Sequence, residues 1–290
     1  MIISMNYLID GKQIAATVLA KVQAQTAVLK RQNITPKLVV VLVGNDQPSH
    51  TYVRRKQQAA EKCGITCEIT YLPETISQED LIDRLYLLQS DASLSGIIVQ
   101  IPLPEHLYTP TVLNAIQPEY DVDCLTHTNL GRLVMKDAPW LPPTPAACLE
   151  IIKSLGMDVV GKNVVIIGTG ALVGKPLSVI LMNERASVTT VNSLTKDRET
   201  KCLSADIIIT GVGKAGMVNG AMVRPGAVVI DAGVCYVDGV MRGDANVDEI
   251  VDHAYITPTP GGVGPITVAK LLANTVTAAA LAHNIKIPEL

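Results

Sequence analysis

The sequence lacks the features that mark membrane-spanning and secreted proteins. Its densest apolar runs, residues 38–43 and 97–101, have the length of strands and fall short of the roughly 18 residues that cross a bilayer. The N-terminus, MIISMNYLIDGK, has no basic segment followed by an apolar core and a small-residue cleavage site. We therefore expect a cytoplasmic protein without a membrane-spanning segment.

An excess of one charge and the usual metal-binding spacings are missing as well. The 24 Lys and Arg residues nearly balance 27 Asp and Glu residues, and the net charge of −3 gives no general attraction to nucleic acid or to an anionic membrane. Six cysteines occur without CxxC spacing and five histidines without HExxH, which argues against a disulfide framework and a zinc site. We expect reduced packing cysteines and no metal.

What is present indicates a globular α/β protein. With 290 residues, of which 48% are apolar and 18% charged, the chain is long enough for one large domain or two moderate ones. Runs rich in Val and Ile alternate with helical patterns, as in βα units built on parallel sheets. The predicted fold class is α/β, with two α/β domains around a cleft, the second of them a Rossmann-like parallel sheet.

Four prolines between residues 139 and 145 mark the predicted domain boundary. Before it we expect strands at 38–43, 66–71 and 97–101, helices at 49–63 and 81–89, and a short helix before residue 118. After a helix at 146–155 we expect strands at 163–167, 187–191, 207–210, 227–230 and 255–257. The terminal helix, 266–282, is too apolar for the surface. The predicted domains are therefore 1–140, completed by 266–290, and 141–265.

A glycine-rich turn follows the predicted strand 163–167. The sequence GTGALVG, from Gly168 to Gly174, lets backbone amides approach a pyrophosphate, and the next helix adds its positive N-terminal end. Its spacing is GxGxxxG, whereas the usual dinucleotide fingerprint is GxGxxG. The turn predicts a nucleotide site at Gly168, Thr169 and Gly170, and the alternative is a tight βα turn without a ligand.

The end of the next predicted strand bears on the choice of nucleotide. Where an Asp or Glu would bind the ribose 2′-hydroxyl of NAD, the chain has Asn192 and Ser193. Ser193 and Thr195 offer hydrogen bonds to a 2′-phosphate, and Lys196 offers positive charge, as does Arg198. The hypothesis is NADP, and the alternative is a loop whose charges only face water.

Tyr52 and Lys56, in SHTYVRRK, form a candidate proton-transfer pair. They are four residues apart in a predicted helix, so both side chains leave one face and the phenol can orient the amine. A lysine works as an acid or base near neutral pH when burial, as in a cleft between two domains, lowers its pKa. The alternative is an exposed helical lysine.

Two further polar residues stand in the first predicted domain. Gln100 interrupts the apolar strand GIIVQI near its carboxyl end, where it bonds to the lysine, to a heterocycle or only to neighbouring backbone. Asp123, in YDVDC, lies on a later loop, where it accepts paired N–H groups of a ring or simply faces water. Late in the chain, PTPGGVGPIT permits close backbone approach to a ligand, or merely a turn into the terminal helix.

Several segments occur together in the order seen in one enzyme family. They are SHTYVRRK, GIIVQIPLP, YDVDC, GTGALVGKP, ADIIITGVGKAG, GAVVIDAGV and TPTPGGVGPIT. Over about residues 7–284 the chain resembles the bifunctional methylenetetrahydrofolate dehydrogenase/methenyltetrahydrofolate cyclohydrolase. The resemblance implies oxidation of 5,10-methylenetetrahydrofolate to the 5,10-methenyl cation with NADP, followed by hydrolysis to 10-formyltetrahydrofolate, in one-carbon metabolism.

By matching position, the resemblance implies a role for each candidate residue. Lys56 is the acid/base of the hydrolysis, Tyr52 orients it or stacks near the folate, and Gln100 holds it. Asp123 binds the pterin-like ring. A homodimer through the nucleotide-binding domains is implied as well. Further substrate contacts are implied at Pro102, Gly262 and Pro265, and cofactor contacts at Gly168, Thr169, Gly170, Ser193 and Val234.

The chain departs from the family pattern in its cofactor and folate loops. Thr169 and Gly170 stand where the family usually has Arg and Ser, and Asn192 replaces a common His. One cation that often contacts a 2′-phosphate is thus missing, so NADP is the prediction and NAD the alternative. Cys124 replaces a usual glycine, and PPTPAAC replaces a loop usually written PCTPxG.

Two other functions compete with this one. A shikimate-type dehydrogenase also pairs a lysine-bearing first domain with a nucleotide-binding second, but the order of the motifs disfavours it. A folate- or nucleotide-binding protein without turnover would not need Lys56, which is present.

Overall fold

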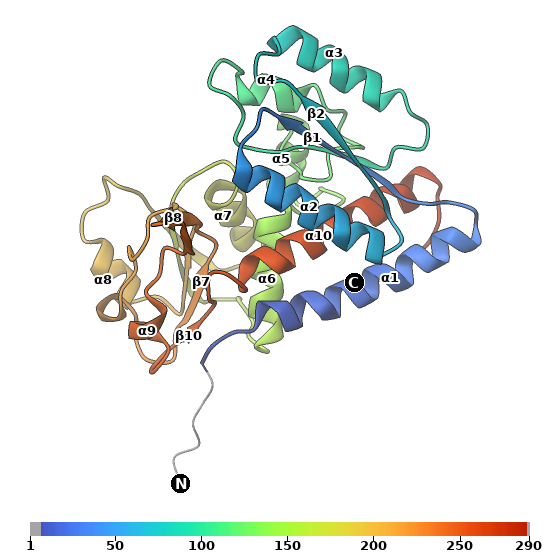
Figure 1. Ribbon diagram of the computed structural model, residues 1–290. Helices are drawn as coiled ribbons and strands as arrows, with labels where there is room; N and C mark the ends of the chain where they lie inside the picture. Colours follow the sequence, from blue (N-terminus) through green and yellow to red (C-terminus); the bar gives the residue numbers. More distant parts are fainter. Residues whose placement is uncertain (1–6, 289–290) are drawn as a thin grey trace. The chain divides into compact units, whose positions relative to one another are not determined.

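Two parallel sheets organise the computed structural model, which describes residues 7–288 (Figure 1). The strand orders are β2-β1-β3 and β10-β7-β6-β4-β5, and β8 and β9 form a separate antiparallel pair. The chain divides into two compact units around these sheets. The Lys56 unit comprises Ala16–Pro143 and residues 268–288, and the Gly168 unit comprises residues 7–15 and Thr144–Thr267. The predicted α/β class with parallel sheets is confirmed.

A buried three-stranded sheet forms the centre of the Lys56 unit. Its middle strand, β1 (Lys37–Val43), reads KLVVVLV and is buried at every position after the first, as expected for a strand covered on both faces. β2 (Thr66–Leu72) and β3 (Gly96–Val99) flank it in parallel, and α2 (Gln47–Lys62) packs on β1 and β2 (Figure 1). The strand order reverses between β1 and β3, so a ligand site is expected at their carboxyl ends.

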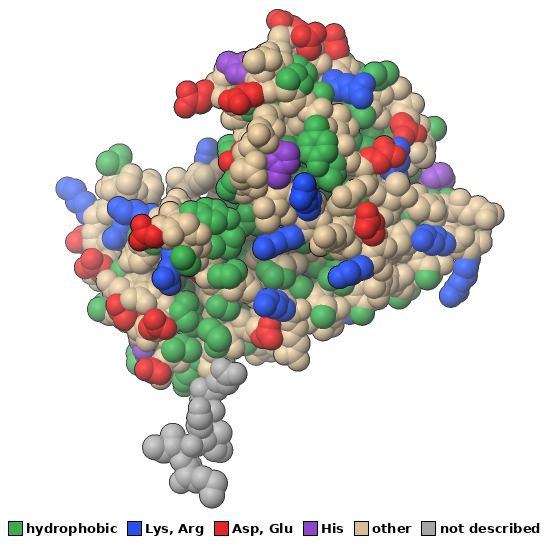
Figure 2. Space-filling view, viewed as in Figure 1, with side chains coloured by type: hydrophobic (Ala, Val, Ile, Leu, Met, Phe, Trp, Pro, Cys, Tyr) green, Lys and Arg blue, Asp and Glu red, His purple; other side chains and the backbone are tan. Residues whose placement is uncertain are grey.

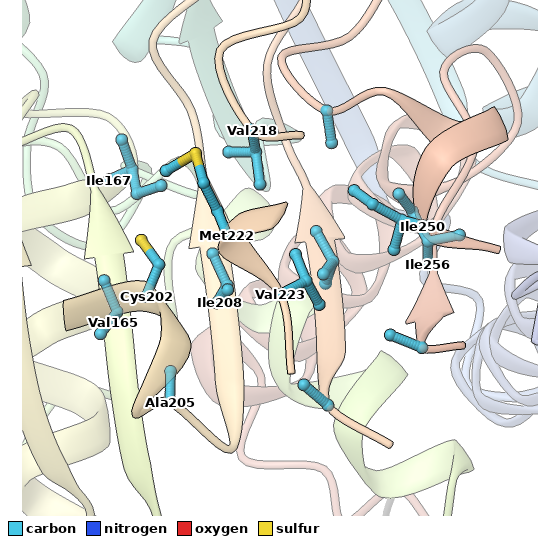
Figure 3. Close-up of a cluster of buried hydrophobic side chains, with 14 of the residues drawn as sticks. Val165, Ile167, Cys202, Ala205, Ile208, Val218, Met222, Val223, Ile250 and Ile256 are labelled. Carbon is cyan, nitrogen blue, oxygen red and sulfur yellow. The ribbon is translucent and has the colours of Figure 1, made fainter. Parts of the chain in front are cut away.

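Five parallel strands form the centre of the Gly168 unit. They are β4 (Asn163–Ile167), β5 (Ser187–Val191), β6 (Ile207–Thr210), β7 (Val228–Asp231) and β10 (Tyr255–Ile256). Counted along the chain their spatial order is 2-1-3-4-5, a Rossmann-like arrangement whose switch point lies between β4 and β6. Val165, Ile167 and Ile208 pack with Met222 and Val218 in a buried apolar cluster (Figure 3).

Helices connect the strands in both units. The Lys56 unit contains α3 (Gln78–Gln89), α4 (Thr109–Asn114) and α5 (His127–Val134). The Gly168 unit contains α7 (Gly174–Asn183), α8 (Arg198–Leu203), the 3-10 turn Gly220–Met222 and α9 (Val247–Ile250). The divisions between the units fall at α6 (Pro143–Ser154) and within α1 (Gly11–Arg31) and α10 (Val263–Ala282). Basic and acidic side chains are interspersed over the face shown in Figure 2.

The sequence patterns located strands more accurately than helices. β4, β5 and β6 have the predicted bounds, but α1 was missed, although Asp10 caps it by accepting hydrogen bonds from the backbone N–H of Lys12 at 2.9 Å and of Gln13 at 3.2 Å. The antiparallel pair β8 (Cys235–Val237) and β9 (Val240–Arg242) was missed as well. The predicted strand 97–101 ends at Val99, and α10 begins three residues before its predicted start.

Each end of the described chain packs with the unit formed mainly by residues far from it in sequence. Residues 7–15 group with the Gly168 unit, although the first predicted domain begins at residue 1, because Ile256 N–H donates to the Tyr7 carbonyl at 2.9 Å and Ile9 N–H to the Ile256 carbonyl at 2.8 Å. The chain from residue 268 groups with the Lys56 unit, where Asn274 Nδ2 donates to the carbonyls of Val122 and Leu141 at 2.8 Å each.

The expectation that no segment is long and apolar enough to cross a membrane is wrong for α10. Within residues 7–288 this 20-residue helix meets that condition, with a mean hydropathy of 1.3, although 61% of the stretch is buried inside the protein. Its apolar side chains are mixed with Thr and Asn instead of forming one run, so a search for runs passes over it. Leu271, Leu272 and Val276 of this helix are buried, so its apolar side chains pack against other parts of the protein.

We predict that Gly174→Ala destabilises the Gly168 unit, whereas Gly170→Ala in the same turn does not. A Cβ atom at Gly174 would lie 1.9 Å from the Gly168 carbonyl oxygen, whereas one at Gly170 would meet no atom within 4 Å. Forced displacement of a packed turn costs about 1–3 kcal/mol. Chemical denaturation of both variants measures the difference in unfolding free energy, and equal stabilities would contradict the close packing of this turn.

Candidate functional site

Helix α2 places Lys56 at the carboxyl edge of the first sheet. The Asp46 carboxylate caps the helix by accepting a hydrogen bond from Ser49 N–H at 2.9 Å, and a proline stands in its first turn. Val53 and Ala60 on α2 are buried, which fixes the face that packs on β1 and β2. Lys56 lies between these two positions in sequence and is half-buried, so the alternative of a fully exposed lysine is excluded.

Gln100 lies directly beyond β3 and contacts Lys56. Its backbone N–H donates to the Val41 carbonyl at 2.8 Å, and its side-chain Nε2 donates to the Ile101 carbonyl at 2.8 Å. That second bond turns the amide oxygen, Oε1, toward the lysine, and Lys56 Nζ donates to it at 3.0 Å. The structure thus brings together the lysine and the glutamine that sequence reasoning paired.

Burial and charge act in opposite directions on the Lys56 amine. Burial lowers its pKa, whereas the negative charge of Asp123, and that of Cys67 when its thiol is ionised, favours the ammonium form. Burial also raises the pKa of Asp123 to about 6, and the Lys56 charge opposes that rise. Because the pKa of Lys56 falls on balance, loss of water outweighs the attraction of Asp123. Sequence reasoning did not identify Cys67 as a neighbour of the lysine.

A second aspartate, Asp121, supports the loop that carries Asp123. It is 1% exposed, and its carboxylate accepts hydrogen bonds from Leu125 N–H at 3.1 Å, Thr126 N–H at 2.9 Å and Asn129 Nδ2 at 2.9 Å. Its own carbonyl accepts the Trp140 Nε1–H bond at 2.8 Å. Such a fully paired carboxylate holds backbone, which leaves Asp123 as the partly exposed acid of this loop.

The residue after Asp123 adopts a conformation that suits glycine. Cys124 has φ +55°, in the left-handed region, and its side chain is fully buried. This explains in physical terms why a glycine would be usual at the position. The cysteine adds a buried apolar group there in exchange for backbone strain of about 1–2 kcal/mol.

The remaining predicted substrate residues fall in both units. Tyr52 is half-buried on α2, one turn before Lys56, and Pro102 is exposed two residues after Gln100. Gly262 and Pro265 belong to the Gly168 unit, where Gly262 is buried and Pro265 lies in the first turn of α10.

The glycine-rich turn follows β4 at the switch point of the second sheet. Gly168 has φ +106°, which favours glycine, and a Cβ atom there would lie 2.8 Å from Val212 Cγ1. Thr169 and Gly170 are exposed beyond it, and the space around Gly170 is open. The turn is thus tightly packed at Gly168 and open at Gly170, which allows a ligand phosphate to approach the backbone amides.

A cation with an unsatisfied nitrogen begins α8, directly after the loop that follows β5. Arg198 is half-buried, and its Nε atom is buried without a hydrogen-bond partner among the described residues. An orphaned guanidinium nitrogen fits an anionic group such as a phosphate. Thr195 Oγ1 accepts a hydrogen bond from Asn192 N–H at 2.9 Å, so this hydroxyl closes the loop, while Ser193 and Lys196 are exposed.

Val234 follows β7 and is 42% exposed at the carboxyl end of that strand. Two buried carboxylates that sequence reasoning missed, Asp231 and Asp244, lie beside it and bond to backbone amides. Their signal in the sequence is slight: Asp231 ends an apolar strand, and Asp244 follows a glycine in a short RGDAN segment.

Comparisons with known proteins match both parts of the chain to one family. A family model described as the catalytic domain of tetrahydrofolate dehydrogenase/cyclohydrolase matches residues 9–123, and the NAD(P)-binding domain of the same family matches residues 142–283. The bifunctional protein FolD of Staphylococcus aureus (strain Newman) is 43% identical to this chain over 273 residues, which cover 93% of this chain and 96% of that protein.

Two solved structures are similar over nearly the whole chain. The bifunctional FolD methylenetetrahydrofolate dehydrogenase/cyclohydrolase from Campylobacter jejuni is 36% identical, with a TM-score of 0.91, covering 94% of this chain and 98% of that one. The dehydrogenase-cyclohydrolase of Trypanosoma brucei, solved with NADP and an inhibitor, is 35% identical, with a TM-score of 0.91, covering 95% and 98%. The chain belongs to the tetrahydrofolate dehydrogenase/cyclohydrolase family.

Proposed function

We propose that this chain catalyses both reactions of its family: oxidation of 5,10-methylenetetrahydrofolate to the 5,10-methenyl cation with NADP, and hydrolysis of that cation to 10-formyltetrahydrofolate. The observation that carries the proposal is the 3.0 Å hydrogen bond between Lys56 and Gln100, which holds a lysine of lowered pKa at the carboxyl edge of its sheet. Matches to both family domains disfavour a shikimate-type enzyme. The Lys56 site disfavours a binding protein without turnover.

The hydrolysis needs a base beside the methenyl carbon. A neutral Lys56 amine takes a proton from water as the water oxygen bonds to that carbon. The bond from this carbon to N5 then breaks, N5 gains a proton, the oxygen becomes the formyl carbonyl on N10, and one proton is released overall. The positive charge of the substrate disfavours a second positive charge nearby, so substrate binding itself favours the neutral amine.

The neighbours of Lys56 supply position and recognition in this proposal. Gln100 fixes the amine through one N–H bond, and Tyr52, one helical turn away, orients it or stacks on the folate. Asp123 accepts N–H groups of the pterin-like ring. Pro102, Gly262 and Pro265 are the remaining proposed substrate contacts.

NADP is the proposed cofactor, and when bound it would supply the acceptor for the hydride of the methylene carbon. The T. brucei relative binds NADP, which supports this choice. The backbone of Gly168, Thr169 and Gly170 would hold its pyrophosphate, and Ser193 and Val234 would contact the rest of the nucleotide. Arg198, whose Nε atom is unpartnered, would take the 2′-phosphate in place of the arginine that Thr169 replaces.

We further propose a cytoplasmic homodimer that binds neither nucleic acid nor membrane. The near balance of charge supports the absence of a nucleic-acid partner. All six cysteines are free thiols, which suits a reducing compartment. Dimerisation through the Gly168 unit follows from the family resemblance, and sedimentation of the purified protein tests it.

We predict that Lys56→Met stops the hydrolysis and leaves the oxidation in place. The substitution keeps the length of the side chain but removes the base, so the rate of methenyl hydrolysis falls by about 100-fold or more. Methenyl absorbance then accumulates during oxidation instead of decaying. Lys62→Met, at an exposed position on the same helix, is the matched control and hydrolyses normally. Undiminished hydrolysis by Lys56→Met would remove Lys56 from the mechanism.

The pH dependence of hydrolysis reports the charge of Lys56. The neutral amine is lost as the pH falls through the lowered pKa, so we predict that kcat for hydrolysis declines on the acid side. In Asp123→Asn the carboxylate that favours the ammonium form is absent, so the decline moves to lower pH. Rates are compared above pH 7, where Asp123, with a pKa of about 6, is ionised, and the rate without enzyme is subtracted. A shift to higher pH would contradict the assignment.

Cofactor choice tests the role of Arg198. We predict that Arg198→Gln raises KM for NADP by about tenfold or more, because a charge-assisted hydrogen bond is lost, and leaves kcat/KM with NAD unchanged. Lys196→Gln, at an exposed position in the same loop, changes KM for NADP by less than about threefold. Equal losses with NADP and NAD in Arg198→Gln would show that the residue supports the loop and does not bind the 2′-phosphate.

A further inference from the structure

A fully buried carboxylate in the Gly168 unit bonds to the loop that follows β6. Asp244 is 0% exposed. Its Oδ2 atom accepts hydrogen bonds from Thr210 Oγ1 and Val212 N–H at 2.8 Å each, and its Oδ1 atom accepts one from Lys214 N–H at 2.6 Å. Two of its three partners are therefore backbone amides of one short loop, residues 211–214.

That loop packs against two segments of the proposed cofactor site. A Cβ atom at Gly168 would lie 2.8 Å from Val212 Cγ1, so the loop rests directly on the start of the glycine-rich turn. A Cβ atom at Gly213 would lie 3.2 Å from the Val234 carbonyl oxygen. The loop thus stands between the turn after β4 and the segment after β7, at the switch point of the sheet.

Asp244 is itself held firmly in the interior. Its carbonyl accepts a hydrogen bond from Val218 N–H at 3.0 Å, and Val218 belongs to the buried cluster in Figure 3. The carboxylate of Asp231 accepts hydrogen bonds from Gly233 N–H and Ala245 N–H at 2.9 Å each, which fixes the residue next to Asp244. At Gly233 a Cβ atom would lie 2.1 Å from the carboxylate carbon of Asp244.

Stability alone gives little reason to bury this charge. Residues 212–214 are exposed, and their amides would otherwise bond to water, whereas removing a carboxylate from water is unfavourable unless all its partners are in place. The arrangement instead restrains an exposed loop at a defined position. Restraint of this kind matters where a loop forms the wall of a binding site.

We propose that Asp244 is a positioning residue for the NADP site. It contacts no cofactor itself; it holds residues 211–214 against Gly168 and Val234, and so fixes the backbone to which the nucleotide binds. This inference rests on the proposed function. Because hydrolysis of the methenyl cation needs no nucleotide, the role predicts that NADP binding depends on Asp244 and that hydrolysis does not.

The test is Asp244→Asn in the full-length protein, examined by NADPH fluorescence titration, by dehydrogenase KM for NADP and by hydrolysis without nucleotide. The amide keeps the shape of the side chain, but its NH2 group is a donor placed opposite groups that donated hydrogen bonds to the carboxylate. At least one of those hydrogen bonds is therefore lost. We expect the dissociation constant and KM for the nucleotide to rise by about tenfold or more, with hydrolysis within about twofold of the original protein.

Asp206→Asn is the matched control. Asp206 also bonds to backbone, accepting Asn163 N–H at 2.8 Å, and it pairs with Arg224, but it lies at the amino ends of β4 and β6. We expect its nucleotide affinity to be unchanged. If Asp244→Asn fails to fold, Thr210→Val decides, since it removes one donor to Asp244; a lower affinity with normal hydrolysis supports the role, and an unchanged affinity overturns it.

Three results would overturn the proposal. They are unchanged NADPH affinity in folded Asp244→Asn, a parallel loss of affinity and hydrolysis, and an equal loss of affinity in Asp206→Asn. Failure of the proposed function has a different signature, because the unsubstituted protein itself would then neither bind NADPH nor oxidise 5,10-methylenetetrahydrofolate.

Discussion

Backbone amides beyond the ends of parallel strands must find acceptors outside the sheet, and buried aspartates supply them in both units. The ladder satisfies N–H groups only as far as the strands run, whereas ligand-binding loops begin where the strands stop. Asp121 accepts from the loop after Asp123, and Asp244 accepts from the loop after β6. The irregular loop at the carboxyl edge of each sheet is held in place because a buried carboxylate accepts hydrogen bonds from its backbone N–H groups.

This support separates the acids that hold backbone from the acid that is available for chemistry. Both carboxylate oxygens of Asp121 accept hydrogen bonds, from Leu125, Thr126 and Asn129, whereas Asp123 is partly exposed beside Lys56. Partial removal of water raises the pKa of this carboxyl and lowers that of the amine, so both protonation equilibria move toward neutral pH. The same partial burial therefore makes Lys56 a usable base in the proposed mechanism and places Asp123 beside it to bind the substrate ring.

Sequence patterns predicted the parts of the structure that depend on local rules. Apolar runs gave β4 and β6 their bounds, since a buried parallel strand is apolar at nearly every position. β5 reads SVTTV and is a largely exposed edge strand, and its β-branched residues marked it instead. Helix α1 escaped because its apolar positions are mixed with Gln, Thr and Lys, and its cap at Asp10 is a single residue. The pairing of Lys56 with Gln100 was accessible because both follow adjacent strands. The roles of Asp121 and Asp244 were not, because two of the three hydrogen bonds to each carboxylate come from backbone amides, which leave no trace in residue types.

The proposed oxidation and hydrolysis draw on residues of different units, which bears on the positions where the sequence is expected to depart from the family pattern. The departures in the cofactor loops, Thr169, Gly170 and Asn192, lie in the Gly168 unit, whereas Lys56, with the hydrogen bond that holds it, belongs to the other. In the proposed mechanism hydrolysis draws on Lys56 and its neighbours and on no group of the nucleotide turn. A change in the turn therefore alters which nucleotide binds without touching the base. Arg198, which follows the next strand and not β4, carries an unpartnered nitrogen that could take over a phosphate contact at this edge of the sheet. That substitution works only if the preceding loop is fixed, and hydrogen bonds from Asn192 N–H to Thr195 Oγ1 and from Leu194 N–H to Asn192 Oδ1 fix it.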